Sequence, residues 1–294
     1  MAESTLSLKY RKPFDWDSLL ATFKAHQLPG LESVSDEFYE RIFHLDRRTG
    51  YFRVAHGSAR RGELKLTLYG ASEQATAKIA ARVRRMFDLD LDPAEVAVVM
   101  HGQPHLGDAW SKHPGLRVAR TWDRFETLIT TVLGQLVSVN FGRTLIHELM
   151  QGYGNRVKHP VTGQGIPLFP APKVLQGAGL LDVRTSVMRR TAIRGLASAA
   201  VDGTLPLNHD PEPKALRRTL LALPGIGAWT AEYVAMRAFD DNDAFPATDY
   251  GLKQEILRHP EMNVNAVRPW RAYAAVALWK DFVARKGMPY EPVV

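Results

Sequence analysis

The chain has 294 residues, of which 45% are hydrophobic and 23% are charged, and this balance excludes a disordered or low-complexity protein. Its 38 Lys and Arg residues exceed its 31 Asp and Glu residues, and the resulting charge of +7 favours a polyanionic partner without establishing one. Cysteine is absent, which excludes disulfides, thiolate zinc sites, cysteine-ligated iron–sulfur clusters and cysteine nucleophiles.

The sequence gives no sign of a membrane protein. No stretch approaches the roughly 18 apolar residues that a spanning helix needs, and the first ten residues lack the apolar core of a signal peptide. We therefore expect a cytoplasmic protein that is associated with the nucleoid and has no membrane partner.

Residues 1–99 are expected to form a mixed α/β domain. Apolar and polar residues alternate in three segments, which is typical of half-buried antiparallel strands: residues 6–8, 51–54 and 64–68. A helical stripe follows, formed by Ile79, Val83, Met86 and Phe87, with Ser72 as the expected N-cap. Nothing in this domain has the pattern of a catalytic site.

Residues 100–122 are rich in Gly, Pro and His and are expected to form a connection without a helix, because Gly102 and Pro104 disfavour one. His101 and His105 have an i, i+4 spacing, but no Glu stands at a metalloprotease spacing. A metal site is therefore disfavoured, and solvated loop histidines are the better interpretation.

The helix that the sequence predicts most strongly follows Asp123, its expected N-cap. Its apolar stripe recurs at helical spacing, at Phe125, Leu128, Ile129, Val132, Leu133 and Leu136. Further helices are expected at residues 185–201 and 212–222, and a proline-rich loop at residues 155–172.

The sharpest motif is LALPGIGAWTA at residues 221–231. A helix ends before Pro224, Gly225 and Gly227 permit a tight turn, and a second helix begins with Trp229. The free N–H groups at the start of that second helix can bind a phosphate without any side-chain charge. An ordinary pair of antiparallel helices is an equally good explanation of these residues alone.

Asp249 stands at the start of another expected helix, a few residues beyond the hairpin, where it can be a simple N-cap. A third segment, residues 269–279, supplies a helix with three aromatic residues, Trp270, Tyr273 and Trp279, of which we assign Trp270 to the core. A phosphate-binding hairpin, a nearby carboxylate and aromatic residues on the same helices form the combination that carries the functional hypothesis.

This combination resembles the helix-hairpin-helix DNA glycosylase superfamily. The resemblance is strongest from residue 114 onward, in segments that keep the family's order and similar separations: residues 114–117, 132–139, 203–206, 224–233, 249–254 and 269–273. Residues 13–16, PFDW, are the main similarity in the N-terminal part. The missing cysteines exclude the iron–sulfur branch of the superfamily.

The resemblance implies an α+β fold, in which an N-terminal antiparallel sheet domain with helices precedes a mainly α-helical glycosylase core. Residues 1–99 would form the first domain, and residues 123–241 the helical domain with the hairpin. Residues 100–122 and 242–294 would form a second helical subdomain that carries the catalytic Asp.

The resemblance also implies roles for individual residues. Asp249 falls on the catalytic aspartate, whose charge would stabilise an oxocarbenium-like state. Trp229 stands where bifunctional members have a Schiff-base lysine, so no lyase activity is expected. Trp229, Tyr233, Trp279 and Phe23 are candidates for the base pocket, although core aromatics are the alternative. The family's register places Thr22, with Phe23 beside it, at a pocket position that is aromatic elsewhere.

The remaining implied contacts are with DNA and a cation. Leu136 matches the wedge that fills the gap left by the flipped nucleotide, although its periodicity alone indicates a core position. The other expected DNA contacts are Gln135, Pro224, Gly225, Ile226, Gly227, Ala228 and Thr230. No cofactor is required, but the main-chain carbonyls of Leu221, Leu223 and Ile226 could hold a structural Na⁺ or K⁺.

Basic residues are frequent between residues 184 and 218, where seven Lys or Arg stand against three acidic residues. They would contact phosphates nonspecifically if they formed a stripe beside the hairpin. A solvated helix face is as good an explanation for any one of them.

The sequence therefore predicts a monomeric, monofunctional DNA glycosylase that removes alkylated bases of the 3-methyladenine type from duplex DNA in base excision repair. One alternative is a glycosylase for oxidised or deaminated purines. The other is a noncatalytic DNA-binding protein that uses the hairpin for phosphate contact alone.

Overall fold

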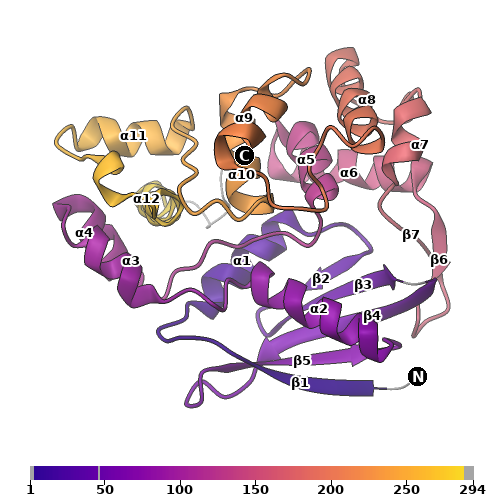
Figure 1. Ribbon diagram of the computed structural model, residues 1–294. Coiled ribbons are helices and arrows are strands. Elements are labelled where there is room, and N and C mark those ends of the chain that lie inside the picture. Colours follow the sequence, from indigo (N-terminus) through magenta and orange to yellow (C-terminus); the bar gives the residue numbers. More distant parts are fainter. Residues whose placement is uncertain (1–2, 46, 288–294) are drawn as a thin grey trace.

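The N-terminal part is built on a five-stranded antiparallel sheet with the strand order β1-β5-β4-β3-β2 (Figure 1). We describe a computed structural model, which covers residues 3–45 and 47–287. The strands are β1 (Glu3–Lys9), β2 (Glu32–Val34), β3 (Phe38–Leu45), β4 (Arg48–His56) and β5 (Glu63–Tyr69). The sequence predicted β1, β4 and β5, whereas β2 and β3 were missed.

Alternation in the predicted strands sets the register of the sheet. Leu66 on β5 lies opposite Leu6 on β1 and Val54 on β4, and the side chains of Val54 and Leu66 are fully buried. Helices α1 (Trp16–His26) and α2 (Glu73–Met86) complete this core. The buried face of α2 includes the expected Ile79 and Val83, and its N-cap Ser72 accepts a hydrogen bond from a main-chain N–H.

The second part of the molecule is almost entirely helical and forms its own core (Figure 1). Its helices are α3 (Pro93–Met100), α4 (Pro104–Lys112), α5 (Arg124–Gly134), α6 (Val139–Tyr153), α7 (Pro172–Gly177), α8 (Val187–Val201), α9 (Pro213–Leu221), α10 (Ala228–Ala238), α11 (Tyr250–Arg258), the 3₁₀ helix η1 (Val264–Val267) and α12 (Arg271–Arg285). The structure confirms the α+β class, the Asp123 cap of α5 and the helices expected at residues 185–201 and 212–222.

Two expectations were wrong. Residues 100–122 contain helix α4, because Pro104 occupies the first helical position, where a missing N–H costs nothing. Helix α4 packs against α12. Residues 155–172 contain a small hairpin of β6 (Arg156–Lys158) and β7 (Gly165–Pro167), in which Pro167 stands at the end of a strand.

Membrane-spanning helices are absent from the described residues: none of their helices combines the necessary length with sufficient apolarity.

A buried ion-pair network fastens the sheet to the helical part. Arg41 on β3 donates to Glu32 at 2.5 Å and to both carboxylate oxygens of Glu126, in the first turn of α5, at 2.7 Å. The Arg41 side chain is 3% exposed. Removal of this cation would leave two poorly hydrated carboxylates without a counter-charge.

We predict that Arg41→Met lowers the free energy of unfolding by about 3–5 kcal/mol, because an uncompensated buried charge is costly. The matched control is Arg53→Met on β4, where the ion pair with Glu40 involves an arginine side chain that is 47% exposed. This control should change stability by less than about 1 kcal/mol. Urea unfolding measures the free energy of unfolding of both variants. Equally small decreases in the two variants would contradict the proposed role of the network.

Candidate active site

The Asp249 carboxylate is buried between two tryptophans. Trp229 donates its indole N–H to Asp249 Oδ2 at 3.0 Å, and Trp279 donates to Oδ1 at 2.8 Å. The main-chain N–H of Leu252 also donates to Oδ1, at 3.0 Å, so Asp249 is the N-cap of α11 as well. A carboxylate only accepts hydrogen bonds, and these three donors match that property. The Asp249 side chain therefore caps helix α11 and is also positioned for the functional role that the resemblance implies.

Two arginines form ion pairs with the loop that precedes Asp249. Arg217 on α9 pairs with Glu232 on α10 at 2.5 Å and with Asp241 at 2.8 Å, and Glu232 accepts from the N–H of Phe245. Arg271 on α12 donates to the Asp243 carboxylate at 2.8 Å. Three helices thus fix the loop between α10 and α11, and with it the place where α11 begins.

The predicted aromatic residues meet beside this carboxylate. The rings of Trp229 and Tyr233 stack, with centroids 4.8 Å apart, and the Trp279 ring lies edge-on to Tyr233 at 6.4 Å. Trp229 is partly exposed, whereas Tyr233 and Trp279 are buried. Trp229 is thus the aromatic surface that a ligand beside Asp249 can reach.

Sequence reasoning missed a polar relay behind Tyr233. Arg237 donates to the Tyr233 hydroxyl at 2.8 Å, and that hydroxyl lies 3.2 Å from His26 Nε2. His26 Nδ1 is 2.9 Å from the carbonyl of Thr22, which can only accept, so Nδ1 carries the proton and Nε2 accepts from Tyr233. The relay joins helix α1 of the N-terminal domain to helix α10 of the hairpin.

The relay works with a neutral imidazole. Burial, reinforced by the nearby Arg237 charge, lowers the pKa of His26 from 6.5 to about 3. Burial also raises the pKa of Tyr233, which keeps its hydroxyl protonated and able to donate. Arg237 itself is buried, and no described residue accepts a hydrogen bond from its Nε.

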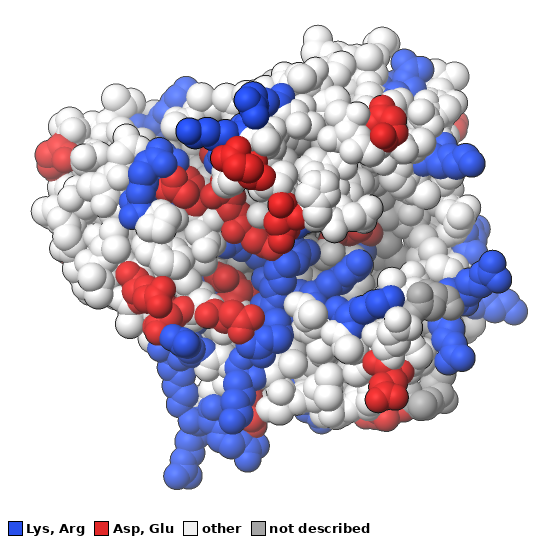
Figure 2. All heavy atoms as spheres, viewed as in Figure 1, with Lys and Arg blue, Asp and Glu red and all other residues white. Residues whose placement is uncertain are grey.

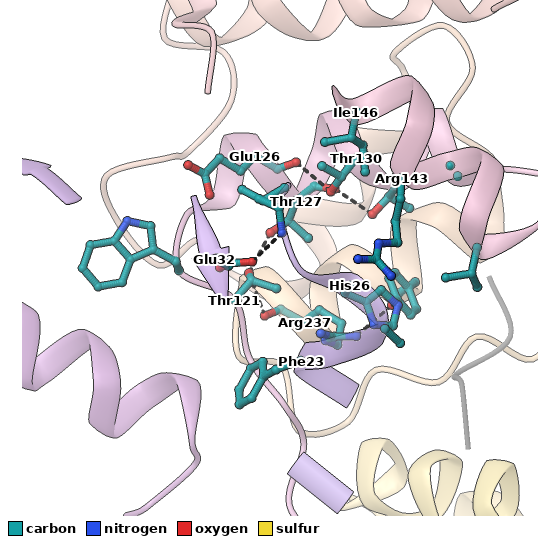
Figure 3. Close-up of a pocket in the computed structure, with 18 of the residues that line it drawn as sticks. Phe23, His26, Glu32, Thr121, Glu126, Thr127, Thr130, Arg143, Ile146 and Arg237 are labelled. Carbon is teal, nitrogen blue, oxygen red and sulfur yellow. Dashed lines mark hydrogen bonds between the residues drawn. The ribbon is translucent and has the colours of Figure 1, made fainter. Parts of the chain in front are cut away.

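A cavity of about 110 Å³ lies on the far side of Tyr233, between α1, α5, α6 and α10 (Figure 3). Arg143, His26 and Arg237 gather on one side of it, and Glu32 and Glu126 on the other. The described residues that line it do not include Trp229 or Asp249. The cavity therefore adjoins the carboxylate site through Tyr233 and is not the carboxylate site itself.

Phe23, the fourth aromatic residue predicted for the base pocket, contacts both a cavity and the N-terminal core. It lines the cavity with Tyr233, but its ring packs against Tyr39 and Phe87 in the N-terminal core. Its neighbour Thr22 is buried and donates to a main-chain carbonyl of its own helix. Both side chains are thus held within the protein.

The hairpin joins α9 to α10 by a turn that depends on Gly225. This residue has φ +77°, and a Cβ there would lie 2.6 Å from the Cβ of Ala192 on α8. Gly225, Gly227 and Ala228 are exposed, whereas the Ile226 side chain is buried. The main chain of the turn, and not its apolar side chain, is therefore presented to solvent at the positive end of α10.

The turn between α5 and α6 lies against the hairpin. Gln135 donates its amide to the carbonyl of Gly225 at 3.1 Å and to the hydroxyl of Thr230 at 2.9 Å. The Thr230 side chain is thus buried, and its hydroxyl accepts a hydrogen bond from within the protein. Only the main chain of Thr230 can therefore make the predicted DNA contact. The predicted DNA contacts, scattered over almost a hundred residues, form one surface.

Leu136 projects from this surface. Its side chain is 97% exposed, and its φ of +55° lies in the left-handed region that leucine rarely adopts. The periodicity that indicated a core position was misleading, because α5 ends at Gly134, before the stripe does. A strained, fully exposed aliphatic side chain is the form expected of a functional residue.

Charge does not form a uniform track on the face drawn in Figure 2, where Lys and Arg lie at the lower left, at the right edge and at the top, and groups of Asp and Glu lie between them. In the basic segment, Arg217 pairs with Glu232 and Asp241, and Arg184 pairs with Glu148. Arg189 and Arg190 donate to main-chain carbonyls. The exposed members are Arg184, Arg194, Lys214 and Arg218.

Taken together, the site offers a fixed negative charge, an accessible aromatic wall beside it and an exposed main-chain anion site next to a projecting apolar side chain. The charge can stabilise a cation that forms against it. The wall can stack on a planar ring.

The low pKa of His26 predicts a specific pH dependence of stability. In the unfolded chain His26 takes up a proton as the pH falls below about 6.5, whereas the folded protein takes it up only near pH 3. The unfolded state is therefore favoured by about 2 kcal/mol at pH 5 relative to pH 7.5. Urea unfolding of His26→Gln should lack this part of the acid sensitivity, and the exposed His147→Gln should retain it. An equal acid sensitivity of the His26 variant and the wild type would show that His26 is not held neutral.

Comparison with known proteins identifies the family. Residues 5–123 match the AlkA N-terminal domain. The chain is 32% identical to DNA-3-methyladenine glycosylase 2 of Escherichia coli, in an alignment over 286 residues that covers 93% of this chain and 96% of that protein. It is 33% identical to a Mycobacterium tuberculosis protein named as a probable bifunctional transcriptional activator/DNA repair enzyme AlkA, over 94% of this chain and 56% of that protein.

Solved structures show the same fold. A 3-methyladenine DNA glycosylase from Archaeoglobus fulgidus superposes with a TM-score of 0.76 at 18% identity, over 96% of this chain and 98% of that one. An 8-oxoguanine glycosylase/lyase of Clostridium acetobutylicum bound to double-stranded DNA superposes with a TM-score of 0.67 at 17% identity. The superposition covers 93% of this chain and 92% of that one. The chain belongs to the DNA-3-methyladenine glycosylase 2 family of helix-hairpin-helix DNA glycosylases.

Proposed function

We propose that this protein is a monofunctional glycosylase that flips an alkylated base out of duplex DNA and hydrolyses its N-glycosidic bond, with Asp249 as the essential carboxylate. The observation that carries the proposal is the Asp249 charge held between Trp229 and Trp279, directly beside the stacked Trp229 and Tyr233 rings. The relatives named DNA-3-methyladenine glycosylases support the same reaction in base excision repair.

The chemistry needs one carboxylate. When the bond from C1′ to the base nitrogen breaks, the base leaves with the electron pair and positive charge develops on the deoxyribose. Asp249 stabilises that charge and orients a water, which adds to C1′ and gives up its proton to the Asp249 carboxylate. A purine alkylated on a ring nitrogen already carries positive charge and leaves as a neutral base, so its departure requires no added proton.

The aromatic wall favours such a base. The electron-rich face of Trp229 attracts a planar cation more strongly than a neutral base. Trp229 stands at the position where lyases of the superfamily carry an amine, and an indole cannot form a Schiff base. The product is then an intact abasic strand.

DNA binding is assigned to the hairpin and the turn before α6. Main-chain N–H groups between Gly225 and Thr230, other than that of Ile226, bind a phosphate, and Leu136 occupies the gap left by the flipped nucleotide. The carbonyls of Leu221, Leu223 and Ile226 suit a Na⁺ or K⁺, which would order the turn: the Leu223 carbonyl accepts one N–H, from Ile226 at 3.3 Å, and retains a second lone pair. We expect a monomer that works at the nucleoid, where its substrate is.

Asp249→Asn tests the catalytic assignment. Asn is as good an N-cap as Asp, and its oxygen can still accept from Leu252 and Trp279. The negative charge and the bond from Trp229 are lost. We expect release of methylated purines from alkylated duplex DNA to fall roughly 100-fold or more in single-turnover assays, with affinity for undamaged DNA unchanged.

The matched control is Asp123→Asn, which makes the same change at the N-cap of α5 and should leave base release unchanged. Equal release by wild type and Asp249→Asn would overturn the role of Asp249. Salt-dependent DNA binding without base release, across a panel of single lesions that includes oxidised and deaminated purines, would favour a noncatalytic binding protein instead.

Leu136→Ala tests the wedge. Because the side chain is 97% exposed, its loss should change the free energy of unfolding by less than about 0.5 kcal/mol. We expect base release to fall for a lesion in a duplex and to change little for the same lesion in single-stranded DNA, which has no gap to fill. The exposed Val98→Ala serves as the control. Equal effects on the two substrates would contradict a wedge.

A further inference from the structure

His105 and His259 meet on the surface although 154 positions separate them in the sequence. Their rings lie with centroids 3.8 Å apart. Glu261 Oε1 is hydrogen-bonded to His105 Nε2 and lies 3.9 Å from His259 Nδ1. One ligand atom from each of the three side chains lies within 4.8 Å of the other two. His101, which shares an i, i+4 spacing with His105 in the sequence, lies apart from this cluster and contacts Ser111.

The main chain fixes the positions of these three residues. His105 is the second residue of α4, after Pro104. His259 is the C-cap of α11, where its N–H donates to the carbonyl of Ile256. Glu261 lies in the turn after α11, which is closed by a bond from the N–H of Met262 to the carbonyl of His259. Two rigid helix ends and a tight turn therefore converge at one point.

The donor set selects for a transition metal. Two imidazoles and one carboxylate are the ligands of many zinc sites, with bonds of about 2.0–2.2 Å, which place ligand atoms about 3.3 Å apart in a tetrahedron. The present separations, up to 4.8 Å, require movements of at most about 1.5 Å by side chains that are 29–58% exposed. Mg²⁺, which prefers oxygen ligands and keeps its waters, is poorly matched.

We propose that His105, His259 and Glu261 form a Zn²⁺ site that ties α4 to the end of α11. The fourth position is open to water, because the cluster lies at the surface. Nothing in the glycosylase chemistry uses these residues, so the site is structural and separate from the reaction.

The position of the site gives it a consequence for the catalytic carboxylate. Asp249 is the N-cap of helix α11 and His259 is its C-cap. Both α11 and α4 pack against α12, which carries Trp279. A metal bridge from α4 to α11 closes this triangle of helices. Zinc should therefore reduce the local opening of the helix that presents Asp249.

The test is Zn²⁺ titration by calorimetry of the full-length protein after removal of metals with a chelator. We expect one site in the wild type, and a loss of affinity by more than roughly 100-fold in His105→Ala, His259→Ala and Glu261→Gln, which exceeds the roughly 10–100-fold cost of losing an outer partner. His101→Ala, an exposed histidine four residues from His105, should bind as the wild type does. Mg²⁺ at the same concentration should give no heat of binding.

Hydrogen exchange supplies a second readout. Zn²⁺ should slow exchange of the main-chain amides of α11 in the wild type and in His101→Ala, but not in His259→Ala. The proposal is overturned if the wild type binds no more Zn²⁺ than His105→Ala/His259→Ala does, or if zinc leaves the exchange of α11 unchanged. Neither readout depends on glycosylase activity.

Discussion

The structure depends on the hydrogen bonds that place the Asp249 carboxylate between two indole N–H groups and the first turn of α11. Each donor comes from a different helix, so α10, α11 and α12 must all be in place before the charge has its partners. Burial of a carboxylate is costly unless it is hydrogen-bonded. The same donors that satisfy the charge also fix the direction in which it can act on a ligand beside Trp229.

Other parts of the molecule support that arrangement. Arginines from α9 and α12 hold the loop before Asp249. The relay from Arg237 through Tyr233 to His26 fixes the second ring of the aromatic wall from the N-terminal domain. The β-sheet domain thus contributes to the site without supplying a residue to the reaction. Gln135 also joins the Leu136 turn to the hairpin, so the proposed phosphate contact and the proposed wedge are held next to each other.

Local patterns predicted much of this architecture. Periodicity and caps identified α2, α5, α8 and α9, and the glycines of the hairpin identified the turn between α9 and α10. The resemblance to the superfamily predicted one site formed by Asp249, Trp229, Tyr233 and Trp279. Strand β2 was missed because it has only three residues. Strand β3 was missed because Arg41, Ile42 and Phe43 are buried in succession, so apolar and polar residues do not alternate there. Helix α4 was missed because it begins at a proline, where local preferences are ambiguous.

The remaining features arise from contacts that no local pattern encodes. His26 and Tyr233 are 207 positions apart in the sequence, and His105 and Glu261 are 156 positions apart. Leu136 shows the opposite failure: its spacing fits the core stripe of α5, but the helix ends two residues earlier and the side chain points into solvent.

The central claim is that a fixed negative charge at Asp249 stabilises positive charge on the sugar. It is tested most directly by the affinity for DNA in which a cationic pyrrolidine replaces the target deoxyribose, compared with DNA that carries a neutral tetrahydrofuran there. The wild type should bind the cationic analogue more tightly, and Asp249→Asn should lose that preference while binding the neutral analogue unchanged. A full preference for the cation in Asp249→Asn would contradict the account.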